Sequence, residues 1–197
     1  MILIRYCGGL GNQMFQYAFQ TAIQEKYKGI SVKADLSHYI LNHEHNGFEL
    51  EKFFQIRLQE AERKEIKKYS PYYMPSAEVL MMPKAIRNFV TERYQYRYTE
   101  QKKKKNPESF YRQEYHSSFE PKVFDLDRNK DWYLDGLWQN LRYLDGYEEK
   151  VRKAFTFHNE ELYTAQDREW KEQIEKRNSV GIHIRRGDFV NSKFDIC

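Results

Sequence analysis

The chain has 197 residues, 40% of them hydrophobic and 31% charged, so it can bury a substantial core beneath a solvated surface. No apolar run reaches the roughly 18 residues of a membrane-spanning helix, and the segment from Met1 to Ile4 already reads as a strand rather than as a secretion signal. We therefore expect a cytoplasmic protein without an integral membrane segment.

The charge balance argues against a dedicated acidic partner. There are 33 Lys and Arg against 29 Asp and Glu, and the basic cluster from Lys102 to Lys105 is typical of a solvated loop. Residues 93–98 have a tyrosine at every second position and arginines at 93 and 97, which suits a platform for single-stranded nucleic acid but equally an amphipathic strand with one buried face. We expect the strand, and no nucleic-acid partner.

The first 35 residues predict a βαβ unit. A short apolar strand covers residues 2–6, a glycine-rich turn covers 7–13, and helix-type spacing of apolar residues continues over 14–28. Gly29 ends this helix, and a second strand over residues 30–34 ends at Asp35. The opening is therefore Rossmann-like and belongs to the α/β class.

The rest of the chain contains no linker rich in Gly, Ser or Pro. Pro71 and Pro75 separate two of its predicted helices. We expect an apolar segment over 48–58 that packs on the sheet, helices over 60–69, 76–88, 148–154 and 160–177, a charged surface segment over 101–109, and strands over 132–138 and 179–184.

Histidines gather in the polar segment of residues 36–47. His43 and His45 have a spacing that would place both rings on one face of a strand, but no third and fourth ligand follow nearby. Cys7 and Cys197 lie at opposite ends of the chain and suit neither a disulfide framework nor a zinc site. We expect solvated histidines and no metal.

Charged residues that could bind a phosphate or a sugar cluster where the last predicted strand ends. His183 precedes the pair Arg185 and Arg186, and Asp188 follows after one glycine. Arginine stays charged and can give paired hydrogen bonds to phosphate oxygens, whereas Asp188 can orient a guanidinium or accept hydrogen bonds from sugar hydroxyls. The carboxyl end of a parallel strand is also where such sheets bind ligands. A surface ion-pair network around a core histidine is the alternative.

A second candidate site is the loop of residues 8–13, which follows the first strand and opens the first helix. Its backbone amides can face an anion or a sugar at a helix N-terminus. Asn12 and Gln13 can both donate and accept hydrogen bonds, which suits a polyhydroxylated ligand. A tight turn that binds nothing is the alternative.

This loop does not match the dinucleotide-binding fingerprint. With Gly9 and Gly11 as its first pair, Met14 stands where a third Gly or Ala belongs. A nicotinamide-dependent oxidoreductase is therefore disfavoured.

Three segments of the chain resemble the alpha-1,2-fucosyltransferase family, glycosyltransferase family 11. They are Gly8 to Ala18 (GGLGNQMFQYA), Asp135 to Gln139 (DGLWQ) and Val180 to Phe189 (VGIHIRRGDF). They span most of the chain in the family's order, and the first and third are highly specific in combination.

The resemblance implies a two-domain glycosyltransferase of the GT-B type. Residues 1–177 would form the Rossmann-like, acceptor-side domain, and residues 178–197 would form the first strand and arginine loop of the donor-binding domain. The implied reaction transfers L-fucose from GDP-L-fucose to a hydroxyl of a galactose-terminated glycan, as in the synthesis of bacterial surface glycans. It forms an alpha-1,2 linkage with inversion and needs no metal or other cofactor.

The resemblance also implies roles for single residues. Arg185 is the candidate for stabilising the leaving pyrophosphate, and the loop of residues 8–13 would line the cleft between domains. A general base is not assigned, although Asp35, Glu44 and the loop histidines are candidates. The implied donor-binding residues are His183, Arg185, Arg186 and Asp188 from the third segment, and Gly9, Gly11, Asn12 and Gln13 from the first.

Members of the family continue for a further half domain beyond the arginine motif. Here only the 19 residues from Ser179 to Cys197 follow the last long helix, and a single βαβ crossover needs about 30 residues. We therefore expect a truncated donor domain and little or no transferase activity of this chain alone. A nonenzymatic module that binds a sugar or a phosphate is the alternative.

Overall fold

A computed structural model describes residues 1–41, 46–72, 77–91, 109–115, 117–157, 161 and 163–182. The chain divides into two compact units, Met1–His158 and Asn159–Cys197, which are described separately below. The sequence-based boundary between residues 177 and 178 stays a prediction.

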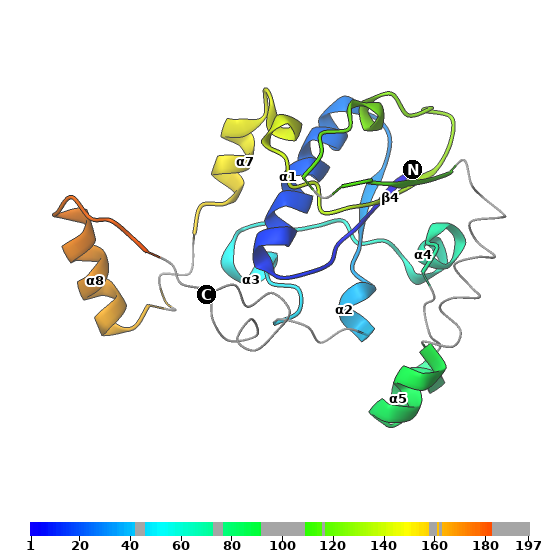
Figure 1. Cartoon of the computed structure of the whole chain (residues 1–197), viewed down its shortest axis with the longest axis horizontal. Coiled ribbons are helices and arrows are strands. Elements are labelled where there is room, and N and C mark those ends of the chain that lie inside the picture. Colours follow the sequence, from blue (N-terminus) through cyan, green and yellow to red (C-terminus); the bar gives the residue numbers. More distant parts are fainter. Residues whose placement is uncertain are drawn as a thin grey trace. The chain divides into compact units, whose positions relative to one another are not determined.

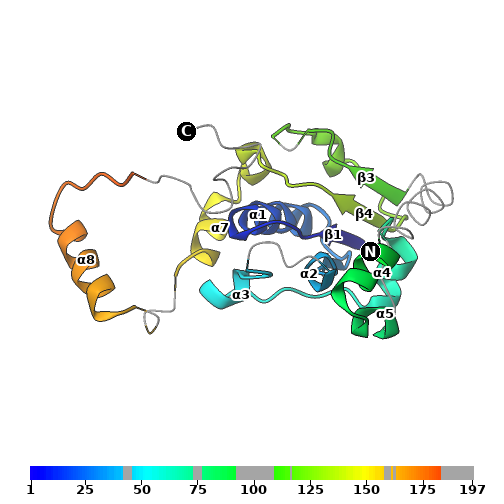
Figure 2. The same cartoon turned by 60° about the horizontal axis from the view of Figure 1, so that its bottom comes forward.

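The first unit is built on a four-stranded parallel sheet with the strand order β2-β1-β4-β3. The strands are β1 (Ile2–Arg5), β2 (Val32–Asp35), β3 (Phe110–Arg112) and β4 (Trp132–Asp135). Ile4 of β1 lies opposite Ala34 on one side and Leu134 on the other. Figure 2 shows β1, β4 and β3 side by side. The parallel sheet confirms the expected α/β class and its Rossmann-like opening.

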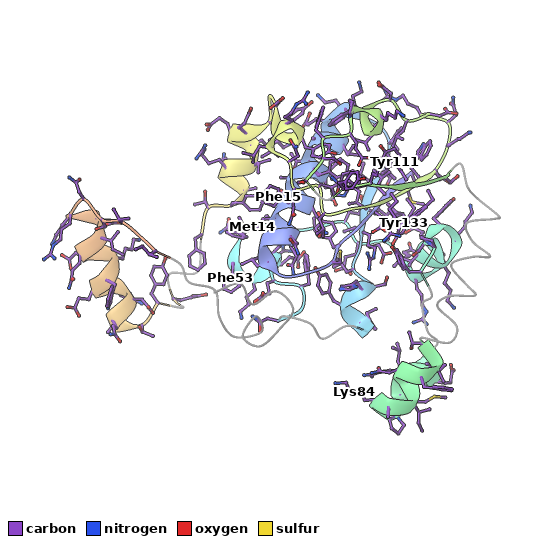
Figure 3. All side chains as sticks on the ribbon, in the orientation of Figure 1. Met14, Phe15, Phe53, Lys84, Tyr111 and Tyr133 are labelled. Carbon is purple, nitrogen blue, oxygen red and sulfur yellow. The ribbon has the colours of Figure 1, made fainter. Side chains whose placement is uncertain are left out.

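Helix α1 (Leu10–Lys26) connects β1 to β2 and packs on one face of the sheet (Figure 1). It begins four residues before the predicted start at Met14 because Gly9, in an extended conformation, is the N-cap. Apolar periodicity cannot show this first turn, which consists largely of Gly and carboxamide residues. Met14 and Phe15 follow it directly, as Figure 3 shows. The core between α1 and the sheet includes Ile2, Ile4, Phe19, Ile23, Leu134, Trp138 and Tyr143.

The other face of the sheet carries polar side chains. Helix α4 (Arg63–Tyr69) contributes to its cover, and Glu65 Oε1 lies 2.7 Å from Nζ of Lys33 on β2. Ser70, directly after α4, is fully buried. The last residues of the strands, described with the site below, lie at the carboxyl edge of the sheet.

The remaining helices of this unit are short. They are α2 (His38–Leu41), α3 (Leu50–Phe53), α5 (Ala77–Met81), α7 (Glu148–Ala154), and the 3-10 turns η2 (Pro121–Phe124) and η3 (Leu141–Leu144). Lys84 lies on a further helical stretch over residues 84–91 (Figure 3). The bounds of α7 match the prediction. Strand β3 was not predicted, because it has only three residues and directly follows the charged surface segment expected over residues 101–109.

In the second unit the described structure is helix α8 (Ala165–Glu175) and a following segment. Thr164 and Asp167 form a capping box at the start of α8. The strand expected over residues 179–184 is not formed over its described part, residues 179–182, where Val180 and Ile182 are exposed. A parallel strand needs hydrogen-bonded neighbours on the sheet, and none pairs with this segment in the described part of the chain. No described helix is long and apolar enough to span a bilayer.

Candidate functional site

The carboxyl edge between β1 and β4 is the natural ligand site of this fold. The chain passes from β1 to β2 on one side of the sheet, whereas β4 is added on the opposite side of β1, so the strand order reverses between β1 and β4. In open α/β sheets ligands bind at the carboxyl ends of the strands where this reversal occurs. The loop of residues 6–9 follows β1, and the loop of residues 136–140 follows β4.

The loop after β1 is a tight turn that exposes the start of α1. Gly8 has φ +79°, a conformation that side chains rarely adopt, and a Cβ at Gly8 would lie 2.2 Å from Asn12 Nδ2. The Gly8 carbonyl accepts hydrogen bonds from Gln13 Nε2 at 3.0 Å and from the Tyr39 hydroxyl at 3.0 Å. No acidic residue occupies the first turn of α1, so its amide groups are available to a polar or anionic ligand.

Gln13 anchors the loop after β1 through its buried side chain. Its side chain is fully buried, and Nε2 also donates to the Gly47 carbonyl at 2.8 Å. Its Oε1 accepts from the Glu49 backbone N–H at 2.8 Å. Both N–H groups of the carboxamide are therefore used within the protein, which gives Gln13 a positioning role in this structure. Its contact with a donor stays a prediction.

Two carboxamides on one side of α1 join the loop after β1 to the loop after β4. Asn12 Oδ1 accepts from Gln139 Nε2 at 2.7 Å. One turn later, Gln16 Nε2 donates to the Gly136 carbonyl at 3.3 Å, and Gln16 Oε1 accepts from the Cys7 backbone N–H at 3.1 Å. Residues four apart lie on the same side of a helix, so Asn12 and Gln16 both face the loop after β4, and Gln16 also binds the loop after β1.

The loop after β4 contains a strained residue. Trp138 has φ +56°, which is unusual for a bulky side chain, and it is fully buried. Its indole stacks on Phe19 with ring centroids 3.9 Å apart. Gln113 Oε1 accepts from the backbone N–H of Leu137 at 3.1 Å and of Trp138 at 2.8 Å, so stacking and hydrogen bonds together hold this conformation.

Gly136 has no room for a side chain. A Cβ at this position would lie 2.8 Å from Gln113 and 2.8 Å from the indole of Trp138. The Trp138 indole N–H beside it has no hydrogen-bond partner among the described residues. The loop after β4 is therefore tightly packed at Gly136.

The last residues of the four strands alternate in charge across the edge. Asp35, Arg5, Asp135 and Arg112 end β2, β1, β4 and β3 in spatial order. Arg5 Nη1 lies 3.0 Å from Asp135 Oδ1, and Arg112 Nε lies 3.5 Å from Asp135 Oδ2. Burial alone would lower the pKa of Arg5, but the Asp135 carboxylate and smaller contributions from neighbouring groups together raise it above its ordinary value.

Tyr72 completes this group. Its hydroxyl donates to Asp135 Oδ2 at 2.5 Å, and its ring lies under the Arg5 guanidinium, 4.1 Å from centroid to Cζ. Burial and the negative charge of Asp135 raise the pKa of Tyr72 well above its ordinary value. The charges at this end of the sheet are thus largely paired within the protein.

The structure also places two of the candidate general bases. Asp35 is fully buried and accepts from the Tyr133 hydroxyl at 2.6 Å and from the Ser37 backbone N–H at 2.9 Å. His38 Nδ1 lies 3.2 Å from Arg5 Nη2. Burial and the charge of Asp35 raise the pKa of Tyr133. Because Asp35 is buried and hydrogen-bonded within the protein, its carboxylate has a structural role in the described unit. Glu44, His43 and His45 lie outside the described residues.

Comparisons with known proteins identify the family of this chain. Residues 1–195 match the family model described as glycosyl transferase family 11. The chain belongs to glycosyltransferase family 11. A curated relative, the alpha-1,2-colitosyltransferase of Escherichia coli, is 30% identical over 193 residues, which is 98% of this chain and 56% of the relative. This family 11 chain therefore spans just over half the length of that relative. No solved structure matches it significantly.

The arginine segment of this family 11 chain remains a sequence-based candidate for donor binding. His183, Arg185, Arg186 and Asp188 lie outside the described residues, so their donor-binding roles stay predictions. Groups of three or more His, Cys, Asp or Glu side chains suited to a metal are absent from the described part of the chain.

Several site residues had no signal in the sequence analysis. Arg5 and Tyr72 looked like parts of a strand and a proline-flanked segment, and each binds Asp135, which is distant from both in sequence. Gln113 directly follows β3, a strand that was not predicted. Gln139 belongs to a recognised segment, but its contact with Asn12 joins positions 127 apart in sequence.

Proposed function

We propose that this protein transfers L-fucose from GDP-L-fucose to a hydroxyl group of a galactoside, with inversion and without a metal ion, forming an alpha-1,2 linkage. The family match over residues 1–195 supports transfer of a sugar from a nucleotide donor to a glycan acceptor. The observation that carries the proposal is the joining of two family segments. Residues 8–18 and 135–139 meet at the strand reversal through the Asn12–Gln139 and Gln16–Gly136 hydrogen bonds.

We assign the described Rossmann-like unit to the acceptor side of a GT-B type enzyme. The start of α1 at its carboxyl edge offers amide groups to a sugar or a phosphate from the facing donor domain. In this proposal Gly9 and Gly11 allow close approach of the ligand, and Asn12 and Gln13 lie near the transferred sugar.

We assign the donor to the arginine segment. As the bond to GDP breaks, negative charge grows on the leaving phosphate, and a preorganised guanidinium of Arg185 stabilises it more than it stabilises the intact donor. His183, Arg186 and Asp188 would hold the nucleotide and orient Arg185. Losing one such contact would raise the barrier by roughly 2.7 to 4 kcal/mol, by analogy with single oxyanion-hole donors.

The name of the curated Escherichia coli relative points to a second sugar donor to be tested. The Escherichia coli protein is named as a colitosyltransferase, and colitose is L-fucose without its 3-hydroxyl group. A site that hydrogen-bonds this hydroxyl discriminates strongly against the sugar that lacks it, whereas a site that packs against C3 discriminates weakly. Comparing the two donors therefore tests how the sugar is held.

The test is product analysis by mass spectrometry with a β-galactoside and each donor. We expect little or no transfer by the 197-residue chain alone, and transfer by a chimera that continues this chain with the remaining segment of the colitosyltransferase. EDTA should leave the rate of the chimera unchanged. A folded chimera that binds GDP but transfers neither sugar would contradict the proposal. Turnover by the 197-residue chain at the chimera's rate would contradict the expected need for a longer donor domain.

A further inference from the structure

We propose that Asn12 and Gln139 together bind two neighbouring hydroxyl groups of a neutral sugar ring. This inference rests on the proposed function, which brings a sugar to the edge between β1 and β4. It assigns Gln139 a role in substrate specificity, and it separates Asn12, which meets the sugar, from Gln13, whose carboxamide holds the loop.

The two carboxamides are held in place from both sides. Asn12 lies in the first turn of α1, where its Nδ2 fills the space that a side chain on Gly8 would need. Gln139 directly follows Trp138, whose backbone is fixed by Gln113 and whose ring is fixed by Phe19. The 2.7 Å bond between Gln139 Nε2 and Asn12 Oδ1 therefore joins two rigid supports, and both side chains remain partly exposed.

The pair keeps unused hydrogen-bonding capacity. A carboxamide has two N–H donors and an oxygen with two lone pairs. Within the described residues nothing else hydrogen-bonds the Asn12 amino group or the Gln139 oxygen. Exchanging the N and O positions of both amides would still leave one amino group and one carbonyl oxygen. Either arrangement presents a donor beside an acceptor.

This combination suits a diol better than a phosphate. Each sugar hydroxyl can donate and accept, so two neighbouring hydroxyls match an adjacent donor and acceptor. A phosphate only accepts, and the remaining carbonyl oxygen would repel it. Neither Asn12 nor Gln139 hydrogen-bonds a charged side chain among the described residues. The sugar could belong to the acceptor or be the one that is transferred, and the experiment separates these two sources.

The first test follows the side-chain amide signals of Asn12 and Gln139 by NMR in the 197-residue chain. Methyl β-galactoside, free L-fucose and inorganic pyrophosphate are added separately at equal concentrations. We expect at least one sugar to shift both signals in a saturable way and pyrophosphate to shift neither. A response to the galactoside identifies the acceptor as the source, and a response to L-fucose identifies the transferred sugar. A response to pyrophosphate alone, or to no probe, overturns the inference.

The second test removes the pair while keeping the fold. Gln139→Asn shortens the side chain by one methylene and breaks the bond to Asn12, and Gln139→Leu removes the polar group. We expect both variants to bind the responding sugar about three- to tenfold more weakly, as for one lost hydrogen bond. The control is Gln173→Leu on α8, where the amide donates to Glu169 at 3.1 Å on an exposed surface and has no other hydrogen bond to a described residue.

Unchanged affinity in a folded Gln139→Asn variant overturns the inference even where Gln139→Leu unfolds. The proposed function is judged by a different result, which is product formation by the chimera. Transfer by the chimera together with silent Asn12 and Gln139 signals would remove this binding site and leave the family 11 reaction standing. Sugar-dependent shifts of the Asn12 and Gln139 signals without transfer by the chimera would support this binding site and contradict the proposed reaction.

Discussion

The guanidinium of Arg5, at the end of β1, lies 3.0 Å from the carboxylate of Asp135, at the end of β4, although the two residues are 130 positions apart. The carboxylate also accepts from Tyr72 and lies 3.5 Å from Arg112. Asp135 therefore ties together β1, β3, β4 and the segment after α4. It also begins the loop that carries Trp138 and Gln139, so the stability of the edge and the geometry of the site are connected.

Replacing Asp135 by Asn should destabilise the fold. Asp135 is only 5% exposed, so its loss leaves Arg5 as a mostly buried charge without a counterion. Removing one partner of a buried ion pair costs roughly 3 kcal/mol, and we expect a fall of this size in the free energy of unfolding in urea. The matched control is Glu149→Gln, because Glu149 is 94% exposed and lies 3.8 Å from Arg152. The control should change stability by less than about 0.5 kcal/mol, and equal effects of the two variants would contradict the role of Asp135.

Two glycines in the site segments should respond oppositely to alanine. At Gly136 the new Cβ would meet Gln113 and Trp138 at 2.8 Å, and both neighbours are packed, so we expect a loss of about 1–3 kcal/mol of stability. At Gly11 a Cβ would meet nothing within 4 Å, and the residue is helical, so Gly11→Ala should stabilise the protein by about 0.5–1 kcal/mol. Thermal unfolding of both variants provides the measurement. A neutral Gly136→Ala would show that the loop after β4 is more adaptable than its contacts indicate.

Gln113 should be needed for the shape of the loop after β4. Gln113→Leu leaves the backbone N–H groups of Leu137 and Trp138 without their acceptor, which should cost at least about 2 kcal/mol of unfolding free energy. Gln113→Glu keeps an acceptor oxygen but loses the hydrogen bond from Nε2 to the Ser118 carbonyl and buries a charge, so it should restore only part of this stability. The ring signals of Trp138 and Phe19 in NMR spectra report the stacking directly. Unshifted ring signals in the Leu variant would mean that stacking alone holds the positive φ.

The pH dependence of stability should reveal the Lys33–Glu65 pair. The hydrogen bond from Lys33, and then that from the Glu62 backbone N–H, lower the pKa of Glu65 below its ordinary value. A lowered pKa means that the stabilising effect is complete above the unfolded value of about 4.3 and is lost as the pH falls through the folded value. Glu65→Gln keeps a side chain suited to the capping box.

We therefore expect the wild type to exceed Glu65→Gln in unfolding free energy at pH 7, by at most about 1 kcal/mol, and the difference to shrink as the pH falls below the unfolded value of about 4.3. Urea titrations at several pH values between 3 and 7 measure this difference. A difference that stays constant or grows toward acid would mean that the carboxylate charge is not responsible.

Local patterns were sufficient to predict the first βαβ unit and α7. Apolar residues recur with helical spacing along α1, and Gly29 separates it from β2, so neither element depends on distant residues for its recognition. The start of α1 was missed because a first turn of Leu10, Gly11, Asn12 and Gln13 has no apolar periodicity. Strand β3 was missed for a related reason, since its three residues are defined by their register with β4 rather than by their own pattern.

The contacts of the site depend on long-range geometry. Which strand lies beside β1 decides whether Arg5 meets Asp135 and whether Asn12 meets Gln139, and the sequence does not show that β4 rather than β3 takes this place. The positive φ of Trp138 is imposed by Gln113 and Phe19 and contradicts the local preference of tryptophan. Gln13 was predicted to face a ligand from its residue type, whereas its burial follows from the position of residues 47–49.

The most direct test of the central claim is to map the backbone amide signals that change when a galactoside is added to the chain. We expect the largest changes in the loops that follow β1 and β4, at residues 8–12 and 136–140, with little change on α8. Changes confined to other parts of the molecule, with both loops unaffected at saturating ligand, would contradict a sugar site at the edge between β1 and β4.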